Sequence, residues 1–216
     1  DIINSVPADR RTEIRERAAN GEFQIFEGPA SGWMFMAFNV ADPANPQNGF
    51  DEEGNLIEQG HHPVLGDVRV RNAIVRAVDY NELNQKAFFE NGIPIYSPFL
   101  TYSWAYNDQL EPYPYDLEAV TALLDEAGWV MNEETGFREC QGCLYAEAGT
   151  PLSFELLSYT GNTSVDAVTV LMKDQLAKAG IDLQLNITEF QTMLEKADTQ
   201  SFDSVMLFLG SLDPNN

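Results

Sequence analysis

The order of apolar patterns in the last third of the chain constrains its fold more than any other feature of the sequence. Apolar and polar residues alternate strictly over residues 181–187, as in a strand that buries one face. Strand-like runs also occur at residues 152–159 and 205–209. Between these strands, residues 163–179 and 190–197 carry apolar side chains at helical spacing. Strands that alternate with helices pair mostly in parallel, so we predict an α/β fold with a mixed, largely parallel sheet flanked by helices.

The preceding two thirds of the chain give weaker signals. We predict helices over residues 8–20, 67–79 and 116–127, and strands over residues 23–27 and 33–39. Residues 41–66 are rich in Pro, Gly, Asn and Asp and are predicted to be a long loop, which could hold a small hairpin turned at Glu53-Gly54-Asn55. Residues 92–115 have no period and are predicted to be a second long loop. The run Thr163-Ser164-Val165-Asp166 is typical of a capping box at the start of a helix.

The chain is strongly acidic. Its 216 residues include 34 Asp and Glu but only 12 Lys and Arg, a formal net charge of -22, and 44% hydrophobic residues are enough to fill a core. Such a surface repels phosphate backbones and anionic lipid headgroups, so we expect no nucleic-acid partner and no peripheral membrane binding. The charge would favour a cationic ligand, or would serve solubility or a saline habitat, and its sign does not distinguish these interpretations.

The two cysteines stand close together, in the run Cys140-Gln141-Gly142-Cys143. A thioredoxin-type redox pair would lie between a strand and the start of a helix, whereas this pair follows a turn and precedes a strand-like run. A zinc site needs four ligands, and the only histidines, His61 and His62, lie far away in the sequence. We therefore favour a local disulfide, with free thiols next and a metal or redox site last. A disulfide would indicate a compartment outside the cytosol.

Signatures of catalysis are scarce. The sequence has no Gly-rich phosphate loop, no dinucleotide-binding fingerprint, no His-Glu-x-x-His and no Gly-x-Ser-x-Gly. A Ser-His-Asp site would have to take its base from His61 or His62. We expect a protein that is not an enzyme and that needs no cofactor and no metal. A thiol-dependent or hydrolytic extracellular enzyme is the alternative.

The ends of the chain lie beside apolar, strand-like runs, and the chain has neither an initiator Met nor a signal peptide. We expect it to be an excised or processed piece of a longer protein. No run of about 20 apolar residues is present, so no segment of this sequence is expected to span a bilayer.

A parallel sheet predicts where a ligand would bind. In open α/β sheets, ligands gather outside the carboxyl ends of the strands. The loops that follow the three predicted strands are residues 159–163, 188–191 and 210–216. Gly210 would permit close approach of the backbone. Asp213 would place a carboxylate beyond the last strand, where it either pairs with a ligand's ammonium group or simply begins a turn.

Six segments match, in order, the pattern of a known family. The clearest is Asp67-Val68-Arg69-Val70-Arg71-Asn72-Ala73-Ile74, which is similar to that family's most recognisable helix. The others are Gly92-Ile93-Pro94, Ala122-Leu123-Leu124-Asp125-Glu126-Ala127-Gly128-Trp129, Leu152-Ser153-Phe154-Glu155-Leu156-Leu157, Gln175-Leu176-Ala177-Lys178-Ala179-Gly180-Ile181 and Ser201-Phe202-Asp203-Ser204-Val205. The chain therefore resembles the bacterial extracellular solute-binding proteins of family 5, the oligopeptide-, dipeptide- and nickel-binding class that serves ABC importers.

The resemblance implies a protein of two large lobes with a ligand enclosed between them. Residues 1–216 would form a single continuous C-terminal lobe of the periplasmic-binding-protein type, and the partner lobe would be absent. Family members commonly hold a peptide amino terminus with an acidic residue at the position of Asp213, and many place an aromatic residue at the position of Phe190. The resemblance also places Asn4 near the cleft, and Gly210 and Ser211, at the end of the last strand, complete the candidate binding residues.

Two features depart from the family pattern. Many members have Gly-Trp near the end of the last strand, where this chain has Phe208 and Leu209. Some peptide binders have arginines near the positions of Ala197 and Met206. These departures count against a peptide as the ligand, and they leave the expectation that the protein binds a solute unchanged.

The same resemblance implies an extracytoplasmic substrate-binding component of an ABC importer. It would reside in the periplasm or at the cell surface, lipid-anchored in its full-length form. Its partners would be a peptide or similar small solute and the permease in the membrane, and we expect it to be a monomer.

Overall fold

The computed structural model describes residues 6–28, 32–46 and 49–210, whose contacts gather into two compact units. The larger unit comprises Met34–Asp79 and Pro112–Phe208. The smaller unit takes in the rest of the described chain. None of the helices in the described ranges combines the length and the apolar character that crossing a bilayer requires.

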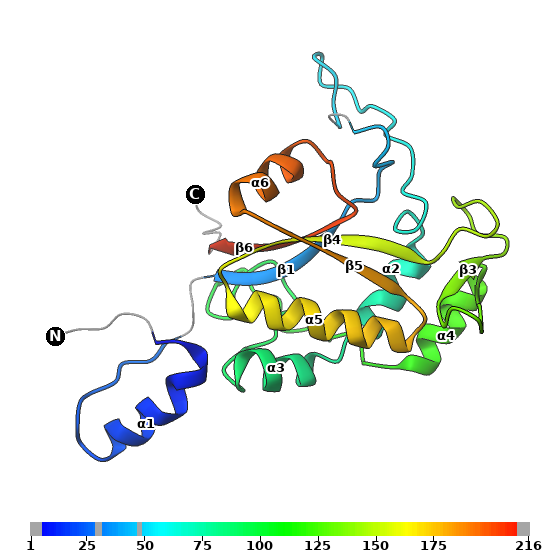
Figure 1. The fold of residues 1–216 in the computed structure, drawn as a ribbon. Coiled ribbons are helices and arrows are strands. Elements are labelled where there is room, and N and C mark those ends of the chain that lie inside the picture. The colour runs from blue at the N-terminus through cyan, green and yellow to red at the C-terminus, as the bar shows by residue number, and fades with distance from the viewer. Residues whose placement is uncertain (1–5, 29–31, 47–48, 211–216) are drawn as a thin grey trace. The chain divides into compact units, whose positions relative to one another are not determined.

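A four-stranded sheet with the order β1-β6-β4-β5 organises the larger unit (Figure 1). Its strands are β1 (Gly32–Phe38), β4 (Ser153–Tyr159), β5 (Asp182–Thr188) and β6 (Ser204–Gly210). β4 pairs in parallel with both β5 and β6. β1 runs antiparallel to β6, because the N–H of Asn39, just after β1, donates to the carbonyl of Asp203, just before β6 (2.8 Å). The sheet is therefore mixed and largely parallel, which confirms the predicted fold class.

Helices α5 (Thr163–Lys178) and α6 (Phe190–Asp198) lie on opposite sides of this sheet (Figure 1). α5 connects β4 to β5, and α6 connects β5 back past β4 to β6. The connection from β4 to β5 and the connection from β5 to β6 run across the sheet in opposite directions. Because crossovers between parallel strands are right-handed, the helices of these two connections lie on opposite faces. The predicted series of three strands and two helices is confirmed.

Asparagine and aspartate side chains cap three helices of the larger unit. Asn162 caps α5 by accepting hydrogen bonds from the N–H groups two and three residues further on. Asp116 caps α4 (Leu117–Glu126) in the same manner, and Asp67 caps α2 (Val68–Arg76) by accepting from the N–H of Arg69 alone. The predicted capping box misplaces the cap by one residue, because Asn162 has the extended backbone of an N-cap whereas Thr163 is already helical.

The core forms where the sheet meets its helices. Leu157 of β4, Met193 of α6 and Val205 of β6 are buried in one cluster. The helix α2 packs against α4. Burying one such aliphatic side chain stabilises the fold by about 1.5–3 kcal/mol. The predicted apolar stripe of the helix over residues 67–79 is confirmed, since all of its members are buried: Val70, Ala73, Ile74, Ala77 and Val78.

The smaller unit contains η1 (Ala8–Arg10), α1 (Arg11–Ala19) and α3 (Tyr80–Phe88). The predicted helix over residues 8–20 is confirmed, whereas α3 is an element that the sequence patterns do not predict. The strand predicted over residues 23–27 is wrong. Its two aromatic side chains, Phe23 and Phe26, are exposed, so no buried face selects a paired, extended conformation.

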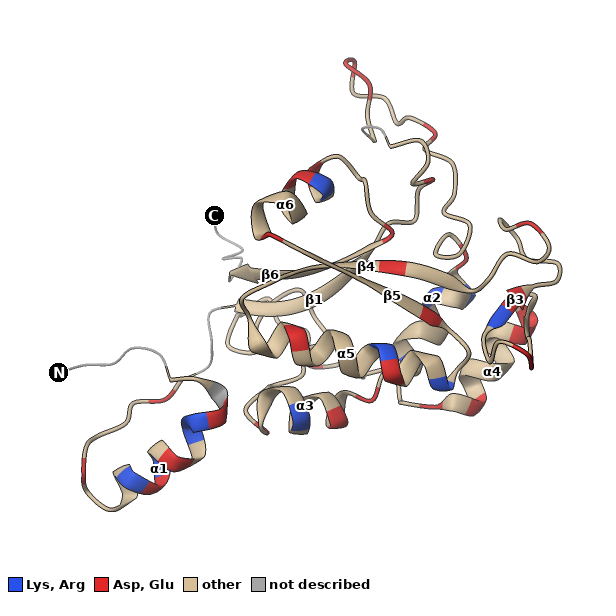
Figure 2. Cartoon of the chain, viewed as in Figure 1, with Lys and Arg blue, Asp and Glu red and all other residues tan. Residues whose placement is uncertain are grey.

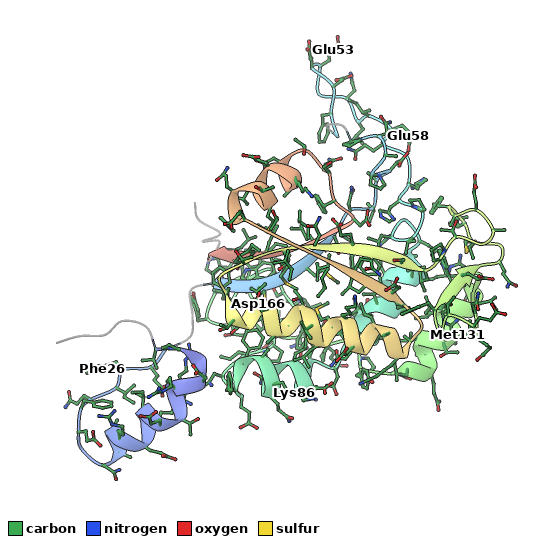
Figure 3. The ribbon with its side chains drawn as sticks, viewed as in Figure 1. Phe26, Glu53, Glu58, Lys86, Met131 and Asp166 are labelled. Atoms are coloured by element: carbon green, nitrogen blue, oxygen red, sulfur yellow. A yellow bond between two sulfur atoms is a disulfide. The ribbon has the colours of Figure 1, made fainter. Side chains whose placement is uncertain are left out.

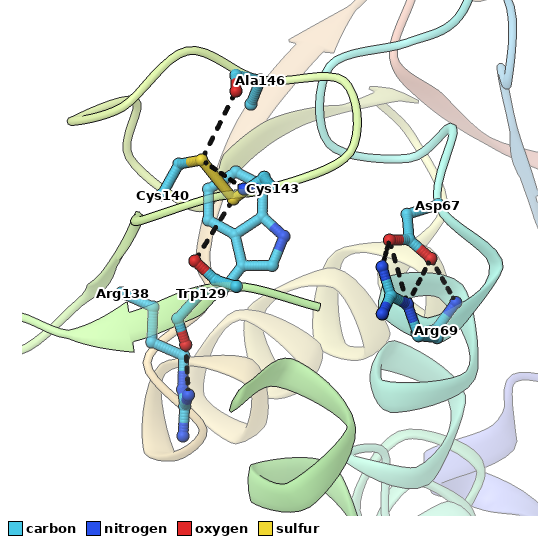
Figure 4. The surroundings of a disulfide bond; sticks show 8 residues. Asp67, Arg69, Trp129, Arg138, Cys140, Cys143 and Ala146 are labelled. Carbon is cyan, nitrogen blue, oxygen red and sulfur yellow. Dashed lines mark hydrogen bonds and ion pairs between the residues drawn. A yellow bond between two sulfur atoms is a disulfide. The ribbon is translucent and has the colours of Figure 1, made fainter. Parts of the chain in front are cut away.

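A disulfide joins Cys140 and Cys143 at the end of the antiparallel pair β2 (Trp129–Met131) and β3 (Arg138–Cys140) (Figure 4). Cys140 is buried. A Cβ added to Gly128, whose φ is +84°, would lie 2.8 Å from the carbonyl carbon of Gly142. Glycine at position 128 therefore lets the cysteine loop lie directly on the end of α4.

Replacing both cysteines by serine is expected to lower the free energy of unfolding by about 2 kcal/mol, because closing so short a loop restricts the unfolded chain only slightly. Denaturant unfolding of Cys140→Ser/Cys143→Ser beside the wild type, in oxidising buffer, measures this difference. A variant that fails to fold would contradict the expectation. Wild-type protein in reductant is the control for the effect of the serines themselves.

A buried histidine ties the segment after β1 to the beginning of β6. Nδ1 of His62 accepts hydrogen bonds from the N–H groups of Val64 (3.0 Å) and Leu65 (2.9 Å), so the proton of the neutral ring lies on Nε2. Nε2 lies 3.1 Å from Oδ1 of Asp203. Oδ2 of Asp203 accepts from the N–H of Glu155 in β4 (2.8 Å). Burial raises the pKa of Asp203, but the interactions with His62 and Glu155 outweigh burial and hold that pKa below its ordinary value.

The lowered pKa of Asp203 predicts how stability depends on pH. A carboxylate whose folded pKa is depressed contributes stability above its unfolded pKa, and that contribution is lost as the pH falls through the folded pKa. Asp203→Asn is expected to cost about 2 kcal/mol of unfolding free energy at neutral pH. Denaturant titrations should show this cost shrinking below about pH 4. A cost that stays constant down to acid pH would argue against the assignment.

Candidate ligand-binding site

The carboxyl ends of the parallel strands lie together at one edge of the sheet. Tyr159 and Thr188, the last residues of β4 and β5, are partners in the parallel register. Val205 of β6 pairs with Leu157 of β4. In this register β6 extends beyond the last residue of β4 at the same end of the sheet. The loops predicted to follow β4 and β5 therefore begin side by side, as a parallel sheet requires.

Large apolar side chains become exposed at this edge. Further back in the sheet, Leu183 of β5 and Met206 of β6 are 1% and 2% exposed. Toward the carboxyl ends, Ile187 is 45% and Phe208 is 53% exposed, and Phe190 at the start of α6 is 51% exposed. The predicted burial of Ile187 is therefore wrong, because the end of β5 extends beyond the buried layer. The register places Ile187 and Phe208 on the α5 face of the sheet, whereas Tyr159 and Phe190 lie on the α6 face, so exposed apolar side chains occur on both faces at this end of the sheet.

Two aromatic rings meet at this edge. The rings of Tyr159 and Phe190 lie 5.2 Å apart between centroids at an interplanar angle of 77°, an edge-to-face contact worth about 0.5–1.5 kcal/mol. Tyr159 also packs against the buried cluster of Leu157, Met193 and Val205. Tyr159 thus positions Phe190 while half of the Phe190 surface stays open. The sequence analysis did not single out Tyr159, although it stands at the start of a predicted ligand loop.

The connections that leave this edge diverge. β4 leads into α5 and β5 leads into α6, and the two helices lie on opposite sides of the sheet (Figure 1). Adjacent parallel strands whose connections part in this way create the crevice in which α/β sheets bind ligands. Tyr159 at the end of β4 and Phe190 at the start of α6 flank that point.

Backbone N–H donors and carboxylates occur at the starts of the helices α5 and α6. The side chain of Glu189, the N-cap residue of α6, makes no capping hydrogen bond, so it does not satisfy the first-turn N–H groups, which favour an anionic partner. Asp166, in the first turn of α5, and Glu189 are exposed carboxylates (Figures 2 and 3). The start of α6 therefore offers N–H donors next to the exposed ring of Phe190, with the Glu189 carboxylate preceding it in the chain.

Among the predicted binding residues, the structure describes Phe190 and Gly210. Phe190 lies at the edge as described above. Gly210 ends β6, and a Cβ there would meet no atom within 4 Å, so no described neighbour requires a glycine. Asp213, Asn4 and Ser211 lie outside the described residues.

The histidines and cysteines are not arranged for catalysis. Both ring nitrogens of His62 face groups in the protein, so neither is placed to take a proton from a nucleophile. His61 stacks on Tyr145 with ring centroids 4.1 Å apart. Cys140 and Cys143 are joined to each other. Within the described part of the chain, no three His, Cys, Asp or Glu side chains are grouped to hold a metal ion.

A shallow groove occurs elsewhere in the larger unit, lined by residues 57–61 together with Val40, Ala41, Gly66 and Arg71. Nη1 of Arg71 donates to the carbonyls of Leu65 (2.6 Å) and Gly66 (2.9 Å). The guanidinium of Arg71, the cation that lines the groove, therefore holds the backbone beside the groove in place. We therefore take the exposed aromatic edge of the sheet, and not this groove, as the candidate ligand site.

Comparison with known proteins identifies relatives along the whole chain. A family model described as "Bacterial extracellular solute-binding proteins, family 5 Middle" matches residues 1–215. The oligopeptide-binding protein OppA of Lactococcus lactis subsp. cremoris (strain SK11) is 27% identical over 212 residues, which are 92% of this chain and 31% of that protein. The chain therefore spans about a third of the length of this curated relative.

Solved structures share the fold. Lactococcal OppA complexed with an endogenous peptide in the closed conformation has a TM-score of 0.72 at 21% identity, over 98% of this chain and 38% of that one. NikA from Brucella suis in complex with Fe(III)-EDTA has a TM-score of 0.71 at 22% identity, over 94% of this chain and 36% of that one. At these identities the likeness establishes the fold alone.

Two residues of α6 offer a test of how this edge is built. Phe190→Ala is expected to lower the free energy of unfolding by about 1 kcal/mol, because the ring is half exposed and loses mainly its contact with Tyr159. Met193→Ala, three residues along the same helix, removes a buried side chain and is expected to cost about 3 kcal/mol. Denaturant unfolding of both variants measures the difference. Equal costs would mean that Phe190 belongs to the core.

Proposed function

Because the chain belongs to the bacterial extracellular solute-binding proteins of family 5, we propose that it is part of the receptor of an ABC importer, which captures a small solute outside the cytoplasm. The solute lies between two lobes, and binding shifts the lobes from an open to a closed arrangement. The closed form then docks on the permease in the membrane. The family consists of substrate-binding proteins, so the proposed role involves no covalent chemistry.

The exposed aromatic edge of the sheet carries this proposal. Ile187, Phe190 and Phe208 are half exposed, whereas Leu183, Met193 and Met206 on the same strands and helix are buried. Leaving such side chains in water is costly, and the cost is offset when a ligand covers them.

We propose that residues 1–216 form one continuous C-terminal lobe and that a second lobe completes the cleft. The chain covers 31–38% of the relatives described above, so most of their length has no counterpart in it. In the full-length protein we propose a lipid anchor at the cell surface or in the periplasm, and a monomeric receptor.

The ligand we propose is a peptide or a similar small solute. An apolar group of the solute would pack on Phe190, beside Tyr159, and its ammonium group would pair with Asp213. The titles of the similar structures describe an endogenous peptide for one protein and Fe(III)-EDTA for another, so one fold serves chemically different solutes. Phe208 and Leu209, in place of a Gly-Trp pair, favour a solute with a substantial apolar part.

The competing function is a thiol-dependent or hydrolytic extracellular enzyme. It would need Cys140 or His62 as its reactive group, and the disulfide and the burial of His62 count against it. A hydrolytic activity of the full-length protein that is lost in His62→Ala, with the fold retained, would favour the enzyme over the receptor.

The proposed function predicts a specific loss of affinity. The full-length protein is purified, the solute that co-purifies is identified by mass spectrometry, and its binding is measured by titration calorimetry. Phe190→Ala is expected to weaken that binding about tenfold, since about 1.4 kcal/mol of apolar contact is lost.

Val170→Ala is the matched control, because Val170 is 53% exposed on α5 whereas Phe190 is 51% exposed at the start of α6. It should bind the solute as the wild type does. The isolated 216-residue chain should bind the same solute very weakly, because it supplies only one side of the cleft. Tight binding by that isolated chain would contradict the two-lobe proposal.

A further inference from the structure

The segment between β1 and α2 forms a hairpin that extends away from the sheet of the larger unit (Figure 1). We call residues 49–60 the acidic arm. Figure 3 labels Glu53 near its tip and Glu58 nearer its base. Phe50 and Leu56 face each other in the arm as an antiparallel bridge.

Hydrogen bonds hold the acidic arm in one conformation. The N–H of Asp51 donates to the carbonyl of Asn55 (2.9 Å), and the N–H of Ile57 donates to the carbonyl of Gly49 (3.0 Å). At the turn, the Asp51 carboxylate accepts from the N–H groups of Glu53 (2.9 Å) and Asn55 (2.8 Å) and from the Asn55 side chain (2.9 Å). A hairpin ordered in this way loses little conformational entropy when it binds.

The base of the acidic arm is tied to the rest of the larger unit. The N–H of Asp42 donates to the carbonyl of Gln59 (3.1 Å), and the N–H of His62 donates to the carbonyl of Val40 (2.9 Å). His62 in turn approaches Asp203, just before β6. The acidic arm is therefore an ordered hairpin whose base is fixed to the segments that flank β1 and β6.

The acidic arm exposes a pair of large apolar side chains. Phe50 is 59% and Leu56 is 81% exposed. Because the two residues are a cross-strand pair, their side chains lie on the same face of the hairpin. An aromatic ring and a leucine on a rigid projection have the form of an anchor that fills a recess on a partner.

Charge decides what kind of partner the arm fits. The arm contains Asp51, Glu52, Glu53 and Glu58, and residues 40–66 contain no Lys or Arg. Anionic lipid would repel this surface, and so would a second copy of a chain whose net charge is -22. The complementary surface is an apolar recess rimmed by Lys and Arg.

We propose that the acidic arm is a docking element that inserts Phe50 and Leu56 into a basic-rimmed apolar recess on the extracytoplasmic side of the importer's permease. This inference rests on the proposed receptor function, which supplies the permease as the partner. The arm's carboxylates steer the two proteins together, and its apolar pair holds them in contact.

The test uses the full-length protein and its own permease held in lipid nanodiscs, with docking followed by surface plasmon resonance. Phe50→Ser/Leu56→Ser is expected to raise the dissociation constant at least tenfold, mainly through faster dissociation. Glu52→Lys/Glu53→Lys is expected to slow association at least tenfold at low salt, and the difference should shrink at high salt.

Two matched variants are the controls. Val170→Ser alters an apolar residue that is exposed to a similar degree on α5. Glu133→Lys/Glu134→Lys makes the same charge change at another exposed glutamate pair, in the turn between β2 and β3. Both controls should dock as the wild type does, and circular dichroism should show every variant folded.

The outcomes separate the two proposals. If the arm variants dock as the wild type does, or if the controls lose docking equally, the arm inference is wrong. Arm variants that dock normally but bind solute more weakly would mean that the arm contacts another part of its own protein, which also overturns the inference. A wild-type protein that binds no solute contradicts the receptor function itself, independently of the arm.

Discussion

Parallel pairing of β4 with both β5 and β6 is the constraint on which the larger unit depends. Parallel neighbours need a long crossover, and the crossovers place helices against both faces of the sheet. α5 and α6 meet that requirement from opposite sides. The same arrangement leaves the carboxyl ends of the strands at an edge that no crossover helix covers. Tyr159 and Phe190 meet at that edge, which is why an aromatic contact there is both well positioned and open.

The two surfaces proposed to be functional lie at opposite ends of β6. Phe208 is exposed toward its carboxyl end, whereas Asp203, just before its first residue, meets His62 at the base of the acidic arm. A receptor has to bind a solute and a membrane partner at the same time, so separate surfaces on one rigid strand suit both tasks. The acidic charge of the chain bears on the second surface in particular, because the arm contains four Asp and Glu residues and residues 40–66 contain no Lys or Arg.

Local patterns predicted those parts of the fold in which one element's own sequence decides its conformation. The alternation over residues 181–187 and the helical spacing that precedes it correspond to β5 and α5. The failures have a common cause. Residues 23–27 have strand-like character but no strand to pair with, and Ile187 continues a buried pattern beyond the layer that would bury it. In each case the conformation or the exposure depended on neighbours distant in sequence.

The sequence by itself determined the order of strands and helices over residues 152–209, the mixed and largely parallel sheet, the family, and the loops after β4 and β5 that are proposed to face a ligand. Periodicity, turn residues and short motifs are local, and they specify such features directly. Only the tertiary structure decided that Tyr159 supports Phe190, that His62 faces Asp203 across 141 positions, and that Phe50 and Leu56 stay uncovered. The physical reason is that contact and exposure are properties of the packed chain, set by which strands become neighbours.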